Sequence, residues 1–184
     1  MESHGDQARD RGGASEGGAI ALSERAPSAA LDVAALMATL HRHGIDFTII
    51  GGVAVQVHGH RRTTKDLDLI PAPDHDNLTR LSAALVELEA RPRDIPGAGP
   101  PTVEQLATAA IVPPLTTRHG ELHILRDVPG APSYEDLRAR ALIIELNDIP
   151  VAIAGIDDVI AMKRATGRPA DLRDIAVLTA LEER

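Results

Sequence analysis

Cysteine is missing from the sequence, which excludes disulfide bonds, thiolate metal ligands and cysteine nucleophiles. Aromatic residues are nearly missing as well, with Phe47 and Tyr134 the only two among 184 residues. Any core must therefore consist of aliphatic side chains, and nucleic-acid modules that stack bases on aromatic rings are disfavoured. No apolar run reaches the roughly eighteen residues of a membrane span, and no apolar segment follows a basic start as in a secretory signal. These absences fit a cytoplasmic protein without membrane contact.

Acidic residues outnumber basic ones, 27 to 19, and the formal net charge is −8. A protein of this charge is not expected to coat nucleic acid non-specifically, so contact with a polyanion requires a local basic patch. Residues 1–27 are rich in glycine, serine and mixed charge. We therefore expect a mostly disordered tail there and one folded domain over residues 28–184.

The spacing of apolar residues predicts both helices and strands. The first helix is expected over residues 28–44, with Ser28 as its N-cap and Gly44 as its end. The last helix begins near Pro169, which is tolerated in a first turn. Further helices are expected at residues 52–59, 74–90, 102–110, 133–141 and 155–167, strands at 46–52 and 65–71, hairpins at 115–127 and 142–154, and a loop at 91–101. This mixture favours an α+β fold with a mixed sheet flanked by helices and a C-terminal helical pair.

Two carboxylates stand one residue apart in the strand pattern "KDLDLIP". Residues i and i+2 of a strand point to the same face, so Asp66 and Asp68 share one face while Leu67 and Leu69 face the core. At about 4 Å, in an effective dielectric near 20, two such charges repel by about 4 kcal/mol. A divalent cation between them reverses the sign of that interaction, and carboxylate oxygens suit Mg²⁺. The alternative is a solvent-facing edge strand with two charged residues.

The residues before this strand give the pair a context. Gly51 and Gly52 lie between a strand and a helix start, where exposed backbone N–H groups can hold a phosphate, although a tight turn also explains them. The basic stretch at residues 58–65 includes Arg62 and Lys65. It is either a solvated loop or a local positive funnel for a triphosphate or an RNA backbone.

Two separated segments, "GGVAVQVHGHRRTTKDLDL" and "KRATGRPADLRDIAVL", carry a resemblance. Together they resemble the nucleotidyltransferase superfamily of the DNA polymerase β kind, and more narrowly the AbiEii and MenT-like toxins of bacterial toxin–antitoxin systems. The resemblance implies a nucleotidyltransferase-like fold and an enzyme that uses Mg²⁺ or Mn²⁺ to transfer NMP from an NTP, with release of pyrophosphate. It further implies tRNA as the acceptor and a cognate antitoxin protein as a partner.

The same resemblance assigns roles to residues of this chain. Asp66 and Asp68 correspond to metal-binding catalytic carboxylates, and Lys163 to a catalytic lysine that meets the phosphates. Nucleotide-binding roles are implied for Gly51, Gly52, Arg62, Lys65, Asp171 and Asp174. Ordinary helix-end electrostatics is an alternative for the last two, because acids are favoured in a first helical turn.

One departure from the resemblance concerns a third carboxylate, which many such enzymes carry on a later strand. The equivalent strand here contains His123 at that position, with Glu121 two residues earlier on the same face. The general base therefore stays open between Glu121, His123 and another group. This departure keeps one alternative in view, a non-catalytic nucleotide- or partner-binding relative. Because the sequence does not define the acceptor, an aminoglycoside-type nucleotidyltransferase acting on a small molecule is a second alternative.

Overall fold

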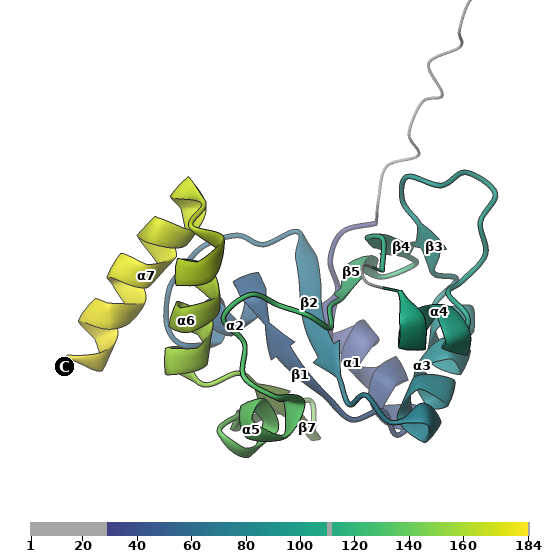
Figure 1. Ribbon diagram of the computed structural model, residues 1–184, viewed down its shortest axis with the longest axis horizontal. Helices are drawn as coiled ribbons and strands as arrows, with labels where there is room; N and C mark the ends of the chain where they lie inside the picture. The colour runs from purple at the N-terminus through teal and green to yellow at the C-terminus, as the bar shows by residue number, and fades with distance from the viewer. Residues whose placement is uncertain (1–28, 110–111, 184) are drawn as a thin grey trace, which may run out of the picture.

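A computed structural model describes residues 29–109 and 112–183 of the chain (Figure 1). Within these residues seven strands form one mixed sheet in the order β3-β4-β5-β2-β1-β7-β6. The strands are β1 (Phe47–Ile50), β2 (Asp66–Pro71), β3 (Arg91–Pro92), β4 (Leu115–Thr117), β5 (Gly120–Ile124), β6 (Leu142–Leu146) and β7 (Ile149–Ile153). The predicted tail, residues 1–27, lies outside the described residues, and its boundary with the domain stays a prediction.

Helices flank the sheet, and the predicted α+β fold with a C-terminal helical pair is confirmed (Figure 1). They are α1 (Val33–Arg42), α2 (Gly51–Val57), α3 (His75–Glu87), α4 (Val103–Thr108), α5 (Tyr134–Ala139), α6 (Ile156–Thr166) and α7 (Pro169–Glu182). Helices α1 and α3 pack together near one end of the sheet, while α6 and α7 lie side by side at the other end, with α2 against α6. In the described part of the chain, no helix has the length and apolar character needed to cross a bilayer.

The centre of the sheet is built from β2 and its two neighbours. Strand β2 pairs with β1 in antiparallel fashion and with β5 in parallel fashion. Leu67 and Leu69 of β2 are fully buried, while Asp66 and Asp68 alternate with them on the opposite face. The parallel register sets Asp66 beside Glu121 and Asp68 beside His123. Alternation along β2 and β5 therefore brings four polar side chains to one face of the sheet.

The core is aliphatic, as the lack of aromatic residues requires. Leu36 and Leu40 of α1, together with Leu81 and Leu85 of α3, have no exposed surface. Each pair is spaced four residues apart, which gives each helix one apolar face to bury against the sheet. The side chain of Asp32 caps α1 by accepting a hydrogen bond from the Ala35 N–H. The prediction of Ser28 as this N-cap is wrong, and Ser28 itself lies outside the described residues.

The segment expected as a loop at residues 91–101 contains one short exception. Arg91 and Pro92 form β3, an edge strand of only two residues paired with β4. A strand this short leaves no periodic pattern to detect, and proline is compatible with a sheet edge. The opposite edge is β6, which joins β7 through Asn147 and Asp148, both at positive φ as a two-residue type I′ hairpin requires.

The connection between α6 and α7 fixes how the last two helices meet. Gly167 ends α6 at a φ of 63°, the left-handed conformation that glycine adopts without strain. Pro169 then opens α7 at its first turn, and the Asp171 carboxylate accepts a hydrogen bond from the Arg168 N–H. This short connection folds α7 back along α6, so polar residues of both helices line the same cleft as Asp66 and Asp68 at the start of β2.

Candidate active site

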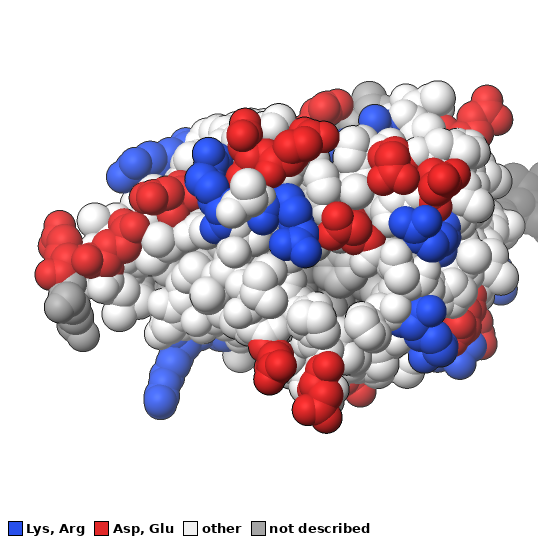
Figure 2. Space-filling view, turned by 90° about the horizontal axis from the view of Figure 1, so that it is seen from below, with Lys and Arg blue, Asp and Glu red and all other residues white. Residues whose placement is uncertain are grey.

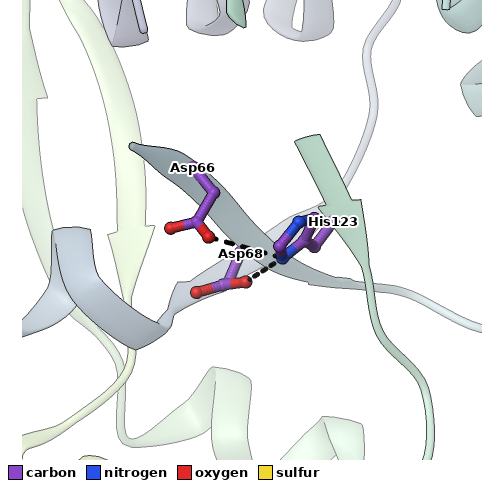
Figure 3. Close-up of side chains that lie close together, drawn as sticks. All are labelled: Asp66, Asp68 and His123. Atoms are coloured by element: carbon purple, nitrogen blue, oxygen red, sulfur yellow. Dashed lines mark hydrogen bonds and ion pairs between the residues drawn. The ribbon is translucent and has the colours of Figure 1, made fainter. Parts of the chain in front are cut away.

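Asp66 and Asp68 point from β2 toward His123 of β5 (Figure 3). The Nδ1 atom of His123 donates a hydrogen bond to Asp68 Oδ1 at 2.8 Å and lies 3.8 Å from Asp66 Oδ2. One potential ligand atom from each of the three residues lies within 4.8 Å of the others. Two oxygens and one nitrogen at this spacing can surround a divalent cation.

His123 has an unusual environment for a histidine. Its pKa is raised above the ordinary value, first by the hydrogen bond with Asp68, then by the negative charges of Asp68, Asp66 and Glu121, while burial opposes the shift. The other ring nitrogen, Nε2, is buried and has no hydrogen-bond partner among the described residues. The nearest carboxylate, Glu121 Oε2, lies 4.0 Å away, and Glu121 Oε1 accepts a hydrogen bond from Arg93 at 2.9 Å.

The glycine pair at the start of α2 is required by close approach. Gly51 has a φ of 64°, and a Cβ atom there would lie 1.9 Å from Asp68 Oδ2. A Cβ atom at Gly52 would lie 2.4 Å from the hydroxyl oxygen of Thr64, which in turn donates to Asp66 Oδ1 at 3.1 Å. Gly51 therefore leaves room for the Asp68 carboxylate, and Gly52 for the Thr64 hydroxyl that supports Asp66.

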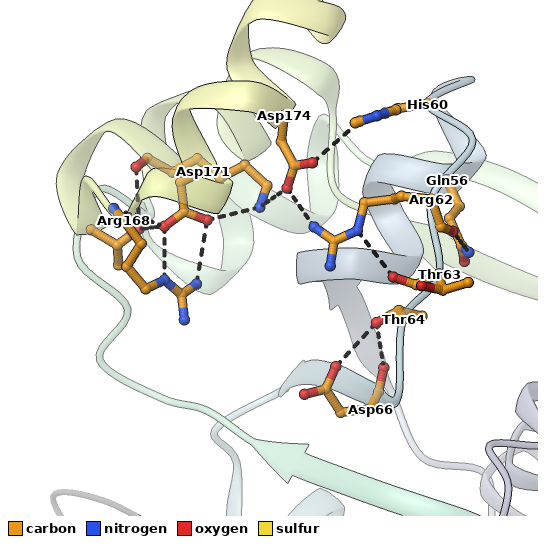
Figure 4. A network of polar contacts seen from close by, with 11 residues as sticks. Gln56, His60, Arg62, Thr63, Thr64, Asp66, Arg168, Asp171 and Asp174 are labelled. Carbon is orange, nitrogen blue, oxygen red and sulfur yellow. Dashed lines mark hydrogen bonds and ion pairs between the residues drawn. The ribbon is translucent and has the colours of Figure 1, made fainter.

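A second cluster joins α6, α7 and the loop after α2 (Figure 4). Lys163 of α6 is only 7% exposed and forms ion pairs with Asp171 at 3.1 Å and Asp174 at 2.7 Å. Arg168 binds the other oxygen of Asp171 at 2.8 Å, and Arg62 binds Asp174 at 2.6 Å. The two carboxylates, 1% and 2% exposed, thus hold three cations along one wall.

The charges of this second cluster do not cancel, because three cationic groups surround two carboxylates. Burial disfavours the ionised form of Asp171, but hydrogen bonds from Arg168, Lys163 and Thr166 hold its pKa well below the ordinary value. The pKa of Arg168 is raised, chiefly by its hydrogen bond to Asp171 and further by the charges of Asp68 and Asp66. By formal charge, the three cationic side chains and two carboxylates leave the wall with one excess positive charge.

Both clusters line one cleft of about 570 Å³. Its lining includes most of the predicted site residues: Gly51, Gly52, Arg62, Asp66, Asp68, Lys163 and Asp171. Asp174 lies behind this lining, where it holds Lys163 and Arg62, and Lys65 is an exposed residue outside the lining. Apart from Lys65, the structure brings the predicted residues together around the cleft, while the role of each one stays a prediction.

Some residues of the site were not predicted. Arg93 reaches Glu121 from the segment after β3, and the Nδ1 atom of His60 lies 3.2 Å from Asp174. Asp127 and Thr166 also line the cleft. No local pattern marks Arg93 or Asp127, because their positions depend on chain segments that pack together far from each other in sequence.

Seen from below, the surface carries acidic and basic side chains interspersed rather than in separate patches (Figure 2).

This fold is shared with solved structures of nucleotidyltransferase type. An antigenic nucleotidyltransferase-like protein from Paracoccidioides brasiliensis is 21% identical, with a TM-score of 0.53 over 81% of this chain and 74% of that one. ANT(2″)-Ia in complex with adenylyl-2″-tobramycin is 14% identical, with a TM-score of 0.50 over 79% and 84% of the two chains. At these identities the likeness concerns the fold alone, and that fold is nucleotidyltransferase-like.

The sequence itself places the chain in a family. Residues 29–182 match the family described as Nucleotidyltransferase of unknown function (DUF6036), and the chain belongs to that family. Comparison with curated proteins found no match. The broad resemblance to nucleotidyltransferases, predicted from the segments at residues 51–69 and 163–178, is thereby confirmed.

Proposed function

We propose that the protein is an active metal-dependent nucleotidyltransferase that transfers NMP from an NTP to an acceptor hydroxyl and releases pyrophosphate. One observation carries the proposal: a carboxylate cluster and a cationic wall line the same cleft. Asp66 and Asp68 lie on the sheet side, and Lys163, Arg168 and Arg62 on the helical side. A triphosphate with its metal needs both kinds of charge at once.

The side chains at the start of β2 fit a divalent cation. Asp66 and Asp68 offer oxygens on one face of the strand, and His123 offers a nitrogen beside them. Mg²⁺ or Mn²⁺ held there would compensate triphosphate charge and favour ionisation of the attacking hydroxyl. Without a cation, the closely spaced carboxylates rely on His123 and Thr64 to offset their mutual repulsion.

The remaining residues bind and orient the nucleotide. Lys163 and Arg168 neutralise the phosphates, and Arg62 with Lys65 extends positive charge toward the cleft mouth. Asp171 and Asp174 serve binding indirectly, because their ion pairs fix the direction of the cationic groups. Gly51 and Gly52 let the triphosphate approach the backbone at the start of α2. Such positioning supplies much of the rate enhancement in phosphoryl-type transfers.

The acceptor we propose is tRNA, and the biological role we propose is that of a cytoplasmic toxin neutralised by a cognate antitoxin protein. The support is the resemblance to AbiEii and MenT-like toxins, together with the basic loop at residues 58–65, which carries Arg62 beside the cleft. A second candidate is a small-molecule hydroxyl. The fold likeness to ANT(2″)-Ia, solved with an adenylylated tobramycin, favours testing it.

The experiment is transfer of label from each of the four α-³²P-labelled NTPs, with Mg²⁺ or Mn²⁺, to total tRNA and separately to an aminoglycoside panel. Wild type should label one acceptor, and Asp66→Asn should not. Glu145→Gln is the matched control, since Glu145 is an exposed carboxylate on the distant edge strand β6. Absence of label with every nucleotide and acceptor, or equal labelling by Asp66→Asn, would contradict the proposal. Label on the aminoglycosides alone would replace tRNA by a small-molecule acceptor.

A further inference from the structure

His123 takes the position beside Asp68 where many related enzymes carry a third carboxylate. We propose that His123 Nδ1 is a metal ligand, that Glu121 orients its ring, and that this site selects first-row transition-metal ions over Mg²⁺. The inference deepens the proposed function and rests on it, because it concerns the same metal centre.

The register of the sheet explains why the imidazole faces the carboxylates. Strands β2 and β5 are parallel neighbours, and Asp68 stands opposite His123 in that pairing. Nδ1 is the ring nitrogen turned toward both aspartates, at 2.8 Å from Asp68 Oδ1 and 3.8 Å from Asp66 Oδ2. A cation between the two carboxylates therefore meets Nδ1 as its next available donor within the cluster.

The surroundings of Nε2 complete the argument for Nδ1 as the ligand. A metal-bound Nδ1 carries no proton, so the ring N–H then lies on Nε2. In the structure Nε2 is buried without a hydrogen-bond partner among the described residues, and Glu121 Oε2 lies 4.0 Å from it. Metal-binding histidines commonly donate their other N–H to a carboxylate, which fixes the ring and raises its basicity. A small movement of the ring toward Glu121 makes that hydrogen bond.

Glu121 is held ready for this role. Its Oε1 atom accepts a hydrogen bond from Arg93 at 2.9 Å, which leaves Oε2 facing the imidazole. Glu121, the acidic residue of β5, is therefore a positioning residue and not a replacement for the third carboxylate. Arg93 also offsets one negative charge close to the two aspartates, so Glu121 does not turn the cluster into three unpaired carboxylates.

Replacing an oxygen ligand by an imidazole nitrogen changes which ion the centre prefers. Mg²⁺ is a hard cation that dehydrates reluctantly and takes oxygen ligands. Imidazole nitrogen suits transition-metal ions, and the affinity of such sites rises from Mn²⁺ through Fe²⁺, Co²⁺ and Ni²⁺ to Cu²⁺. We use Mn²⁺ as the probe because it is paramagnetic and is the transition-metal ion closest to Mg²⁺ in its preference for oxygen.

The test measures binding, separately from catalysis. Mn²⁺ is titrated into the full-length protein and free Mn²⁺ is followed by electron paramagnetic resonance, with Mg²⁺ as competitor. Electron spin-echo modulation of bound Mn²⁺ should show coupling to one imidazole ¹⁴N. In His123→Asp that coupling should disappear, and the ratio of Mn²⁺ to Mg²⁺ affinity should fall about tenfold. His41→Asp is the matched control, because His41 is an exposed histidine on α1.

Glu121 is tested with two substitutions. Glu121→Ala should weaken Mn²⁺ binding about tenfold and alter the ¹⁴N coupling, whereas Glu121→Gln keeps an acceptor oxygen and should restore part of the affinity. Thermal unfolding followed by circular dichroism checks that each variant folds. Equal effects of the alanine and glutamine substitutions on coupling and affinity would remove Glu121 from the proposal.

The outcomes separate this inference from the proposed function. Transfer of NMP without any ¹⁴N coupling, or an unchanged metal preference in His123→Asp, overturns the inference and leaves the function standing. A ¹⁴N-coupled Mn²⁺ site that selects against Mg²⁺, in a protein that labels no acceptor, supports the inference and removes the function. Failure of wild type to bind Mn²⁺ at all overturns the inference as well.

Discussion

Replacement of Gly51 by alanine tests the close approach between α2 and Asp68. The new Cβ atom would lie 1.9 Å from Asp68 Oδ2, 2.7 Å from its Cγ and 2.9 Å from its Cβ. Because Cβ contacts under 3.0 Å essentially do not occur, the carboxylate or the start of α2 must move by about 1 Å. A displacement of that size at a reacting centre costs about 100-fold in rate.

The chain offers a control for the backbone part of this effect. Gly44 has nearly the same φ, 65°, but the nearest atom to its added Cβ is Arg80 Cδ at 4.0 Å. Both alanine variants should lose about 1–2 kcal/mol of unfolding free energy from the left-handed conformation. Only Gly51→Ala should also lose Asp68 from its position, and with it NMP transfer and Mn²⁺ affinity.

Urea unfolding gives the stability of each variant, label transfer gives the activity, and NMR gives the pKa of His123. If Asp68 moves, its hydrogen bond to His123 weakens and that pKa falls toward the ordinary value in Gly51→Ala alone. The reasoning is refuted if the two variants match each other in transfer rate, Mn²⁺ affinity and His123 pKa. A larger stability loss in Gly51→Ala would not by itself show that Asp68 has moved.

Three further predictions concern single groups. Asp148→Gly should raise the unfolding free energy by about 0.5–1 kcal/mol in urea denaturation, because Asp148 has a φ of 61° in the β6–β7 turn. Because the pKa of Asp171 is lowered in the folded protein, its contribution to stability is present above the ordinary pKa of aspartate and is lost as pH falls toward the folded-state value. In Asp171→Asn, the unfolding free energy measured in urea should therefore fall less between pH 7 and pH 3 than in wild type. In metal-free protein, the raised pKa of His123 contributes stability that is present below pH 6.5 and is lost as pH rises through the folded-state pKa. NMR titration should find the pKa of His123 lowered in Asp68→Asn. An unchanged pKa would disprove the assignment of the shift to Asp68.

The sequence predicted the first cluster of the site because its pattern is local. Alternation along residues 65–71 determines that Asp66 and Asp68 share a face, whatever the strand pairs with. The glycine pair at the start of α2 was predicted as a phosphate-binding or tight turn, whereas its close approach to Asp68 and Thr64 depends on packing and was not predicted. Burial of Leu67 and Leu69, which alternate with the two carboxylates, follows from the same pattern, and the structure confirms this prediction.

The second cluster depended on distances that local patterns do not contain. Asp171 and Asp174 fitted an ordinary helix N-terminus, and nothing in α7 alone indicates that Arg62, 112 residues before Asp174, binds there. The ion pair between Arg93 and Glu121 could not be predicted from the sequence either, because it depends on where the segment after β3 lies. Propensity and periodicity describe single elements, whereas these contacts are set by how the elements pack.

Lys163 makes the two closing helices dependent on each other. Its ammonium group is buried on α6, and both of its counter-charges come from α7. Detachment of α7 would leave an unpaired charge in a poorly solvated place, a state of high free energy. Amide hydrogens of α6 and α7 should therefore exchange through one shared opening event rather than by independent fraying. The wall that faces the aspartates is then present as a whole or lost as a whole.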